Sequence, residues 1–326
     1  MTDLPRLIIL DVSHGNCSIL QDTKGTIIVD CAHGDTLIET LRHLEISHID
    51  RIMISHADQD HFKGFIDLLA DQSITVKHVH INPDKVKNTL VFTALNLAIK
   101  DAQTRMETSR EFLNSDMTGQ LDVGEVAIEV LFPSKNMLSG DKDLKGRSLK
   151  PNSVSAVIRL VYKSRGAALL TADIDQVGLD NLLTTHSKIE ADVLIFPHHG
   201  GNVGVGREKD NQDFTASLCS QVKPKLVLFS TGRDKHNNPR KEIVKTVLQT
   251  IPDVHIMCTQ LAKSCSSDIL AITPIHLTSL PSKGKESNHC CGGTVVINLK
   301  ETATTYDPDS DHKLFVKNHV VSALCK

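Results

Sequence analysis

Four potential metal ligands lie close together near the N-terminal end of this chain: His56, Asp58, Asp60 and His61. Imidazole nitrogens and carboxylate oxygens are common protein ligands of divalent metal ions. Crowding like charges together costs free energy, and a bound cation offsets that cost. The ligands directly follow the apolar residues 52–54, which are typical of a short buried strand. The sequence therefore predicts a metal site at a strand end, and a metalloenzyme is the first hypothesis for function.

Composition excludes several classes of protein. The chain has 326 residues with 40% hydrophobic and 23% charged residues, as in soluble globular proteins. Its formal net charge of -3 gives no overall attraction to nucleic acid, so any phosphate-binding surface must be local. Without Trp and with only two Tyr, a broad platform for stacking bases is not expected.

No apolar stretch approaches the roughly 20 residues that span a bilayer, and no signal peptide is evident. We therefore expect a cytoplasmic protein with no membrane partner. Its eight cysteines are then expected to be reduced.

The elements that must position the ligands can be read from hydrophobic periodicity. Antiparallel strands are expected at 7–12, 17–20 and 26–30, and further strands at 49–55, 76–81, 126–132, 153–160, 167–172, 191–196, 225–230, 254–258 and 294–299. Helices are expected at 36–44, 90–111, 177–183 and 240–249, with others beginning near residue 65 and lying around 214–218. Polar clusters follow several of these strands, so their side chains can converge on one edge.

Strands in two clusters with helices between them predict two sheets with helices outside. We expect one domain over residues 1–326, with a polar loop at about 279–293 and a weakly patterned tail at about 301–326.

Three ordered motifs resemble those of the metallo-β-lactamase superfamily, which implies an αββα sandwich of the α/β (α+β) class. The motifs are His56-x-Asp58-x-Asp60-His61, Leu170-Thr171-Ala172-Asp173 and Pro197-His198-His199-Gly200. The usual first motif is His-x-His-x-Asp-His, and Asp58 stands in place of its second His. That variant resembles the metallo-β-lactamase domain of ComEC-type DNA-uptake proteins and their free-standing relatives.

Shorter segments agree with this subgroup, over about residues 6 to 299. They are Asp11-Val12-Ser13-His14-Gly15-Asn16, Ile27-Ile28-Val29-Asp30, Asn152-Ser153, and Ser230-Thr231-Gly232-Arg233 with Asn238-Pro239.

The resemblance implies a site with two divalent metal ions, Zn²⁺ or Mn²⁺ with Mg²⁺ as a further candidate. His56 and Asp58 would hold one ion, and Asp60 and His61 the other. Asp173 would bridge both ions, and one of His198 and His199 would complete the second site. A hydroxide held between the ions would be the nucleophile. Asp60 or Asp173 could accept its proton as the catalytic base.

Two departures from the family pattern affect the metal. Many relatives place a third His on the first metal, and Asn152 stands at the matching position. With Asp58 also replacing a His, the first site would be rich in oxygen ligands. Such ligands shift the preference from Zn²⁺ toward Mn²⁺ or Mg²⁺.

Structural interpretations compete with these assignments. The first motif could be a solvated loop with an N-capping Asp, and Asp173 could cap the next helix. His198 and His199 could be a surface pair, and His14 a turn residue. As substrate-binding residues we consider His14, Asn152, Arg233 and His236. Arg233 lies at a strand end and could contact an anion, and the resemblance places His236 near a substrate-facing His of some relatives.

The C-terminal cysteines raise a separate question. Cys258, Cys265, His289, Cys290 and Cys291 could bind a structural zinc, but their spacing fits no standard knuckle and ordinary buried residues are the favoured interpretation.

The leading functional hypothesis is a phosphodiesterase or nuclease acting on DNA. One alternative is hydrolysis of a small ester, lactone or cyclic nucleotide. Another is a non-catalytic binding or regulatory subunit with a protein partner. The sequence does not determine the oligomeric state.

Overall fold

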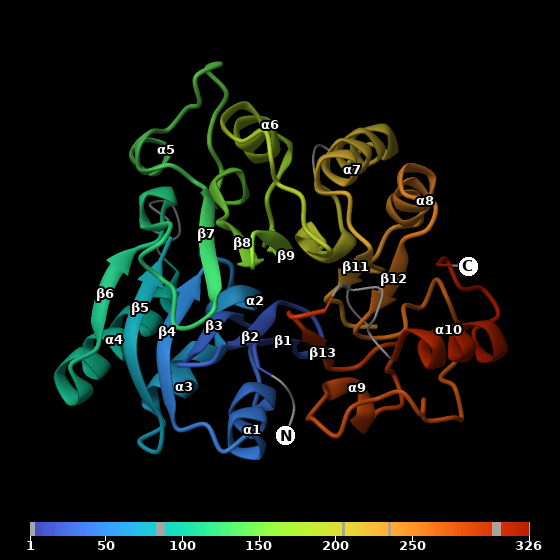
Figure 1. The fold of residues 1–326 in the computed structure, drawn as a ribbon, viewed down its shortest axis with the longest axis horizontal. Helices are drawn as coiled ribbons and strands as arrows, with labels where there is room; N and C mark the ends of the chain where they lie inside the picture. Colours follow the sequence, from blue (N-terminus) through green and yellow to red (C-terminus); the bar gives the residue numbers. More distant parts are fainter. Residues whose placement is uncertain (1–3, 83–88, 204–205, 234–235, 302–307, 326) are drawn as a thin grey trace.

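Two mixed β-sheets form the centre of the molecule in this computed structural model, which describes residues 4–82, 89–203, 206–233, 236–301 and 308–325 (Figure 1). The first sheet has the strand order β13 (Val295–Asn298), β1 (Arg6–Ile9), β2 (Cys17–Gln21), β3 (Thr26–Cys31), β4 (His48–Ile54), β5 (Thr75–Ile81) and β6 (Ser109–Phe112). The second has the order β12 (His255–Cys258), β11 (Leu226–Phe229), β10 (Val193–Ile195), β9 (Arg165–Leu170), β8 (Val157–Tyr162) and β7 (Val126–Phe132).

Each sheet combines antiparallel and parallel pairs. In the first sheet β13, β1, β2 and β3 pair antiparallel, as predicted for the N-terminal strands, and β3, β4, β5 and β6 pair parallel. In the second, β7, β8 and β9 pair antiparallel, and β9, β10, β11 and β12 pair parallel. Parallel neighbours end at the same edge of a sheet, so the loops after β4, β9, β10 and β11 can meet there.

Helices cover the outer faces of both sheets (Figure 1). Those of the N-terminal half are α1 (Thr36–His43), α2 (Gln59–Phe62), α3 (Gly64–Ala70) and α4 (Leu90–Met106), followed by the short α5 (Lys135–Ser139). Those of the C-terminal half are α6 (Gln176–Thr185), α7 (Glu208–Val222), α8 (Lys241–Thr250), α9 (Lys283–Glu286) and α10 (Pro308–His319). Short 3₁₀ turns lie at Ser115–Met117, Asn152–Val154 and Pro197–Gly200.

Three buried apolar clusters correspond to the three interfaces of a four-layer sandwich. One packs α1, α3 and α4 on the first sheet, with Leu41, Phe65 and Ile99 fully buried. A second lies between the two sheets, and a third packs α6, α7 and α8 on the second sheet around Phe214. This arrangement confirms the expected αββα sandwich.

Two predicted boundaries differ in the structure. The helix expected over 90–111 ends at Met106, where Glu107 adopts a left-handed φ of 57°, and β6 follows as a partner of β5. The helical pattern of the sequence continues past Met106, but residues 109–112 pair with β5 and form an edge strand instead. The weakly patterned tail contains α10, whose Phe315 and Val316 are buried in the third cluster. None of the helices in the described ranges is long and apolar enough to cross a membrane.

Candidate metal centre

The ends of four strands bring the candidate ligands together. His14 lies after β1, the first motif after β4, Asp173 after β9, and His198 and His199 after β10. Three residues here have a left-handed backbone: Ala172 (φ 46°), His198 (φ 54°) and His199 (φ 56°). Such conformations cost free energy in non-glycine residues and cluster at functional sites.

A fully buried inner group consists of His56, His61 and Asp173, whose candidate ligand atoms all lie within 4.8 Å of one another. Nε2 of His61 is 3.1 Å from Oδ1 of Asp173, and Nε2 of His56 is 3.9 Å from its Oδ2. The imidazole rings of the two histidines lie 4.1 Å apart, centroid to centroid. Asp173 therefore directs one oxygen toward each histidine.

Asp30 and Ser55 orient the two inner histidines. Oδ2 of Asp30 lies 2.7 Å from Nδ1 of His61 and also accepts a hydrogen bond of 2.7 Å from the hydroxyl of Ser55. That hydroxyl lies 3.1 Å from Nδ1 of His56. With each Nδ1 engaged on the outer side, each Nε2 points toward Asp173 with its lone pair. This carboxylate–histidine arrangement is typical of metal sites.

A second group, nearer the surface, consists of His14, Asp60 and His199, whose candidate ligand atoms also lie within 4.8 Å. Oδ2 of Asp60 is 3.3 Å from Nε2 of His199 and 3.4 Å from Nε2 of His14. Nδ1 of His199 donates to the carbonyl of Ser230 at 2.8 Å. The carbonyl fixes the tautomer, so Nε2 of His199 carries a lone pair toward Asp60.

Asp173 connects the two groups. Its Oδ1 lies 3.1 Å from Nε2 of His61 and 3.7 Å from Nε2 of His199. Its Oδ2 lies near His56 and is 3.0 Å from Nδ1 of His198. A carboxylate whose two oxygens face different sets of nitrogens has the placement of a bridging ligand.

The donor chemistry fits divalent cations. Within the described residues, the buried atoms Nε2 of His61, Nε2 of His199 and Oδ1 of Asp173 have no hydrogen-bond partner. Nitrogen lone pairs and carboxylate oxygens that face each other at 3.1–3.7 Å repel unless a cation lies between them. Two such groups joined by Asp173 are consistent with a dinuclear metal centre.

The pKa values of His61 and Asp173 are also consistent with a cation in the inner group. Burial alone would lower the pKa of His61, but the carboxylates of Asp173 and Asp30 raise it well above its usual range. Burial opposes ionisation of Asp173, yet the charges of His61 and His199 hold its pKa well below the usual range. In the absence of metal, a proton on His61 thus serves as the cation among these carboxylates.

Burial keeps two other histidines of the site, His56 and His14, neutral. Burial lowers the pKa of His56 to about 3, with a further contribution from His61. Burial and the neighbouring His199 lower the pKa of His14 to about 4. Burial opposes ionisation of Asp60, but its contact with His199 and the charge of His61 lower its pKa. Neutral imidazoles and ionised carboxylates are the forms that bind metal.

The structure distinguishes His198 from His199. His199 is 3% exposed at its side chain and lies between Asp60 and Asp173, whereas His198 is 33% exposed. Nδ1 of His198 lies 3.3 Å from the amide nitrogen of Asn152 as well as beside Asp173. His199 is therefore the better-placed ligand, and His198 and Asn152 border the site together.

Asp58 and Asp173 are not used as helix caps. Asp58 precedes α2 but makes no capping hydrogen bond through its side chain, and its Oδ2 lies 3.6 Å from Nε2 of His56. The N-cap of α6 is Asp175, which accepts from the amide of Gly178. Both carboxylates considered as caps in the sequence thus face the His/Asp groups.

Two predicted substrate-binding residues have different environments. Arg233 is buried, and its guanidinium donates to the carbonyls of Leu261, Ser266, Ser267 and Asp268. Because these hydrogen bonds occupy the guanidinium nitrogens, Arg233 is placed to stabilise the fold and not to face a substrate.

His236 does approach the site, with its ring 4.7 Å from that of His14. The sequence assigned no positioning role in the metal site to Asp30, Ser55 or Ser230. For Asp30, its place in a family-like strand end was the available signal.

Cys258, Cys265, His289, Cys290 and Cys291 do not form one group of ligand atoms among the described residues. Cys258, Cys265 and Cys291 belong to the apolar cluster under α8 and α10, whereas the thiol of Cys290 lies beside Ser282. In the described ranges, both groups suited to a metal consist of His and Asp alone.

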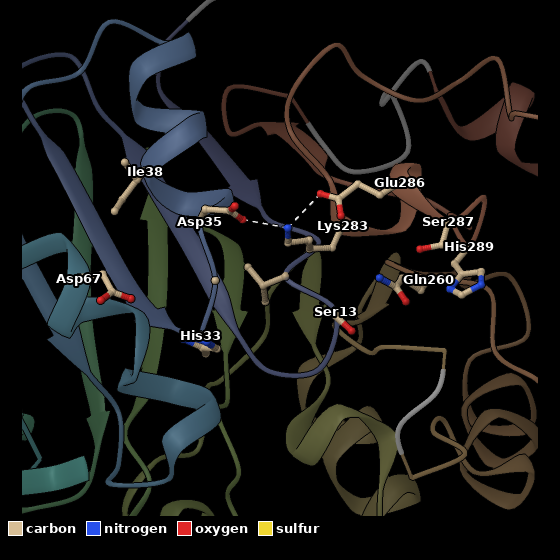
Figure 2. Close-up of a pocket in the computed structure, with 12 residues that line it drawn as sticks. Ser13, His33, Asp35, Ile38, Asp67, Gln260, Lys283, Glu286, Ser287 and His289 are labelled. Carbon is tan, nitrogen blue, oxygen red and sulfur yellow. Dashed lines mark hydrogen bonds and ion pairs between the residues drawn. The ribbon is translucent and has the colours of Figure 1, made fainter.

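A cavity of about 720 Å³ lies between the loop of Ser13 and the segment around Lys283 (Figure 2). Ser13, the residue before His14, lines it together with His33, Gln260 and Lys283. The ammonium of Lys283 lies 2.9 Å from carboxylate oxygens of both Asp35 and Glu286. The cavity wall combines polar side chains with the apolar Val12 and Ile38, and the charge of Lys283 is balanced by two carboxylates.

The sandwich and its His/Asp groups define a metal hydrolase of the metallo-β-lactamase fold. Residues 10–129 match the model of the metallo-beta-lactamase superfamily. A similar curated protein is ComE operon protein 3 of Bacillus subtilis (strain 168), with 22% identity over 217 residues, covering 64% of this chain and 23% of that protein. The chain thus spans about a quarter of the length of this relative.

Solved structures to which the chain is similar include the metallo-beta-lactamase fold protein YhfI from Bacillus subtilis, at 14% identity and a TM-score of 0.49, covering 78% of this chain and 96% of that one. Igni18, a metallo hydrolase from Ignicoccus hospitalis, shares 12% identity with a TM-score of 0.43, covering 77% and 94% of the two chains.

Proposed function

We propose that this protein is a metal-dependent phosphodiesterase that acts as a nuclease on DNA. The observation that carries the proposal is the position of Asp173, whose two carboxylate oxygens face the nitrogens of His61 and His56 separately. Two-metal sites bridged in this way are suited to displacement at phosphorus, where charge develops on both the attacking and the leaving oxygen. The DNA assignment rests on the resemblance of the ordered motifs to DNA-uptake proteins.

Bound divalent ions would lower the pKa of a water molecule and neutralise charge on the phosphodiester. His56, Asp58 and Asp173 would hold one ion, and Asp60, His61, Asp173 and His199 the other.

Asp60 is better placed than Asp173 to take a proton from water. Its side chain is 29% exposed, whereas that of Asp173 is 4% exposed and lies between the two groups. Asp30 keeps His61 aligned through Nδ1, and the carbonyl of Ser230 does the same for His199. His198 and Asn152, at the border of the site, are positioned to contact a phosphate oxygen.

A small phosphodiester, such as a cyclic nucleotide, is a second candidate because of the cavity that Ser13 and Lys283 line. Its volume of about 720 Å³ lies in the range of small-molecule sites. Its cation, Lys283, already contacts Asp35 and Glu286, so this wall offers little net attraction to a polyanion. This feature favours a compact substrate over a long nucleic acid at that wall.

We also propose that the site works best with Mn²⁺ and that the first ion is bound the more weakly. Asp58 lies beside His56 where relatives have a second His, and Asn152 lies at the border where many have a third. An oxygen-rich site favours Mn²⁺ or Mg²⁺ over Zn²⁺.

A substrate panel tests the function. Purified protein with Mn²⁺, Mg²⁺ or Zn²⁺ is offered single- and double-stranded DNA, RNA, a cyclic dinucleotide, bis-p-nitrophenyl phosphate and a lactone. Cleavage of DNA that disappears in Asp60→Ala and Asp173→Ala supports the nuclease. Turnover of the cyclic dinucleotide alone supports the small-substrate candidate, and turnover of the lactone alone rejects both. An absence of turnover with every metal favours a binding or regulatory subunit.

A further inference from the structure

We propose that His14 is a metal ligand and makes the position shared by Asp60 and His199 a nitrogen-rich, zinc-retaining site. The inference rests on the proposed function, because it concerns the same metal centre. Neither the motif pattern nor the family resemblance assigns a ligand role to this residue. It follows from where the fold places the imidazole.

Contact distances support a shared ion. Ligand nitrogens and oxygens bind Zn²⁺ at about 2.0–2.2 Å, so two ligands of one tetrahedral ion lie roughly 3.3–3.6 Å apart. Oδ2 of Asp60 is 3.4 Å from Nε2 of His14 and 3.3 Å from Nε2 of His199. The imidazole rings of the two histidines are 4.6 Å apart and tilted, so they approach the carboxylate from different directions.

The loop of His14 is fixed to the loop of Asp60. The amide of Asn16 donates to the carbonyl of Asp60 at 3.1 Å, and Gly15 lies directly against the same residue. A Cβ at Gly15 would come within 2.5 Å of the carbonyl oxygen of Asp60, and the φ of Gly15 is 125°. Only glycine permits this close approach without strain.

The same loop is also fixed to the support of His199. The hydroxyl of Ser230 donates to the carbonyl of Gly15 at 2.7 Å, while the carbonyl of Ser230 accepts from Nδ1 of His199. The backbone of Gly232 packs on Ser13 and His14. His14 is therefore held by the loop that carries Asp60 and by the loop that orients His199, as preorganised ligation requires.

The ligand set defines the metal class. His14 adds a third imidazole to those of His61 and His199, beside the carboxylates of Asp60 and Asp173, and a ligand set this rich in nitrogen suits Zn²⁺ better than Mn²⁺ or Mg²⁺. The position at His56 and Asp58 is richer in oxygen. The two positions are therefore expected to differ in metal preference, with zinc retained at the group that contains His14.

Direct metal binding tests the inference. Apo protein of the full chain is titrated with Zn²⁺ by calorimetry, and zinc content is measured after dialysis for wild type, His14→Gln, His14→Glu and His236→Gln. His236→Gln is the matched control, because its ring lies 4.7 Å from His14 but outside both groups.

We expect His14→Gln to weaken the tighter zinc by at least about tenfold, the scale of disturbed metal sites. His14→Glu should retain an ion and shift the preference toward Mn²⁺, and His236→Gln should bind as wild type. The visible spectrum of the Co²⁺-substituted protein should change in both His14 variants and stay as wild type in His236→Gln. Wild-type affinities and spectrum in folded His14→Gln would overturn the ligand role.

The same experiment distinguishes failure of the metal-dependent function from failure of the ligand role of His14. Wild-type protein that binds no divalent ion contradicts the metal-dependent function itself. Wild-type protein that binds two ions and hydrolyses bis-p-nitrophenyl phosphate, while His14→Gln binds them equally well, rejects only the role of His14.

Discussion

Nε2 of His199 lies 3.3 Å from Oδ2 of Asp60, although the two residues follow strands of different sheets. The carbonyl of Ser230 engages the opposite nitrogen of His199, so a lone pair and a carboxylate face each other. Such a pair is stable when a cation lies between its atoms. The candidate metal centre thus connects loops from the two sheets as well as gathering the reactive groups.

Replacement of Asp173 should remove the connection between the two groups. In Asp173→Asn the side chain keeps its size but loses the charge that faces His56, His61 and His199. We expect bound metal to fall and hydrolysis to drop at least ~1000-fold, since loss of metal catalysis costs several kcal/mol. Metal content and turnover of bis-p-nitrophenyl phosphate measure the effect. Asp175→Asn, which can still cap α6, is the control and should retain its metal.

Asp30 should act as a positioning residue. Its carboxylate bonds to Nδ1 of His61 and to the amide and hydroxyl of Ser55. We expect Asp30→Asn to weaken metal affinity by roughly 10–100-fold, the usual cost of a lost outer-shell partner. Calorimetric titration with Mn²⁺ gives the affinity. Asp35→Asn, at an exposed carboxylate outside the site, should bind as wild type; equal affinities in both variants would contradict the assignment.

Metal removal should destabilise the fold. The two groups join loops of both sheets, and a ligand present at 100 times its Kd stabilises the folded state by about 2.7 kcal/mol. We expect the thermal midpoint to fall on chelation and to recover with added metal, with activity restored best by Mn²⁺. Differential scanning calorimetry and activity after add-back measure both. Full zinc occupancy at both positions, with no gain from Mn²⁺, would contradict the manganese preference.

Arg233 should contribute to stability rather than to substrate binding. Its guanidinium donates to the carbonyls of Leu261, Ser266, Ser267 and Asp268, and hydrogen bonds from a charged donor contribute about 1.5–3 kcal/mol each. We expect Arg233→Met to lower the free energy of unfolding by roughly 3 kcal/mol and to leave KM unchanged for the folded fraction. Urea denaturation and steady-state kinetics separate the two effects. A raised KM with wild-type stability would restore the substrate-binding interpretation.

His80 should make the fold sensitive to acid. His80 is buried, with its Nε2 3.1 Å from Nη1 of Arg51 and its Nδ1 3.9 Å from the carboxylate of Glu111. Burial, and then the charges of Arg51 and His78, lower the pKa of His80 to about 4. Because the unfolded state binds the proton first, the free energy of unfolding rises with pH between about 4 and about 6.5.

We expect this histidine to contribute on the order of 2 kcal/mol to the loss of stability between pH 7.5 and pH 5. His80→Gln keeps an acceptor for Arg51 but cannot titrate in this range. Between pH 7.5 and pH 5 the variant should therefore lose about 2 kcal/mol less of its free energy of unfolding than the wild type does. Urea denaturation at both pH values gives the difference. Parallel pH dependences for wild type and variant would show that His80 does not titrate as described.

The sequence by itself determined the fold class and which residues of ligand type are available to the site. Hydrophobic periodicity marked the buried strands, and ordered polar clusters after those strands carried the resemblance. Helical periodicity over 90–111 was misleading beyond Met106, because pairing with β5 overrode local propensity at β6. The helix α10 lacked a strong pattern and is stabilised by packing in the third cluster.

Only the tertiary structure decided which ligands face each other. Spacing could not separate His198 from His199, since the choice depends on a carbonyl of Ser230 from another strand. It could not place His14 beside Asp60, because that contact is made by loop-to-loop hydrogen bonds across the sheet edge. Nor could it show that the guanidinium of Arg233 is committed to backbone carbonyls. Local patterns encode side-chain type and burial, whereas the direction of a lone pair depends on partners distant in the chain.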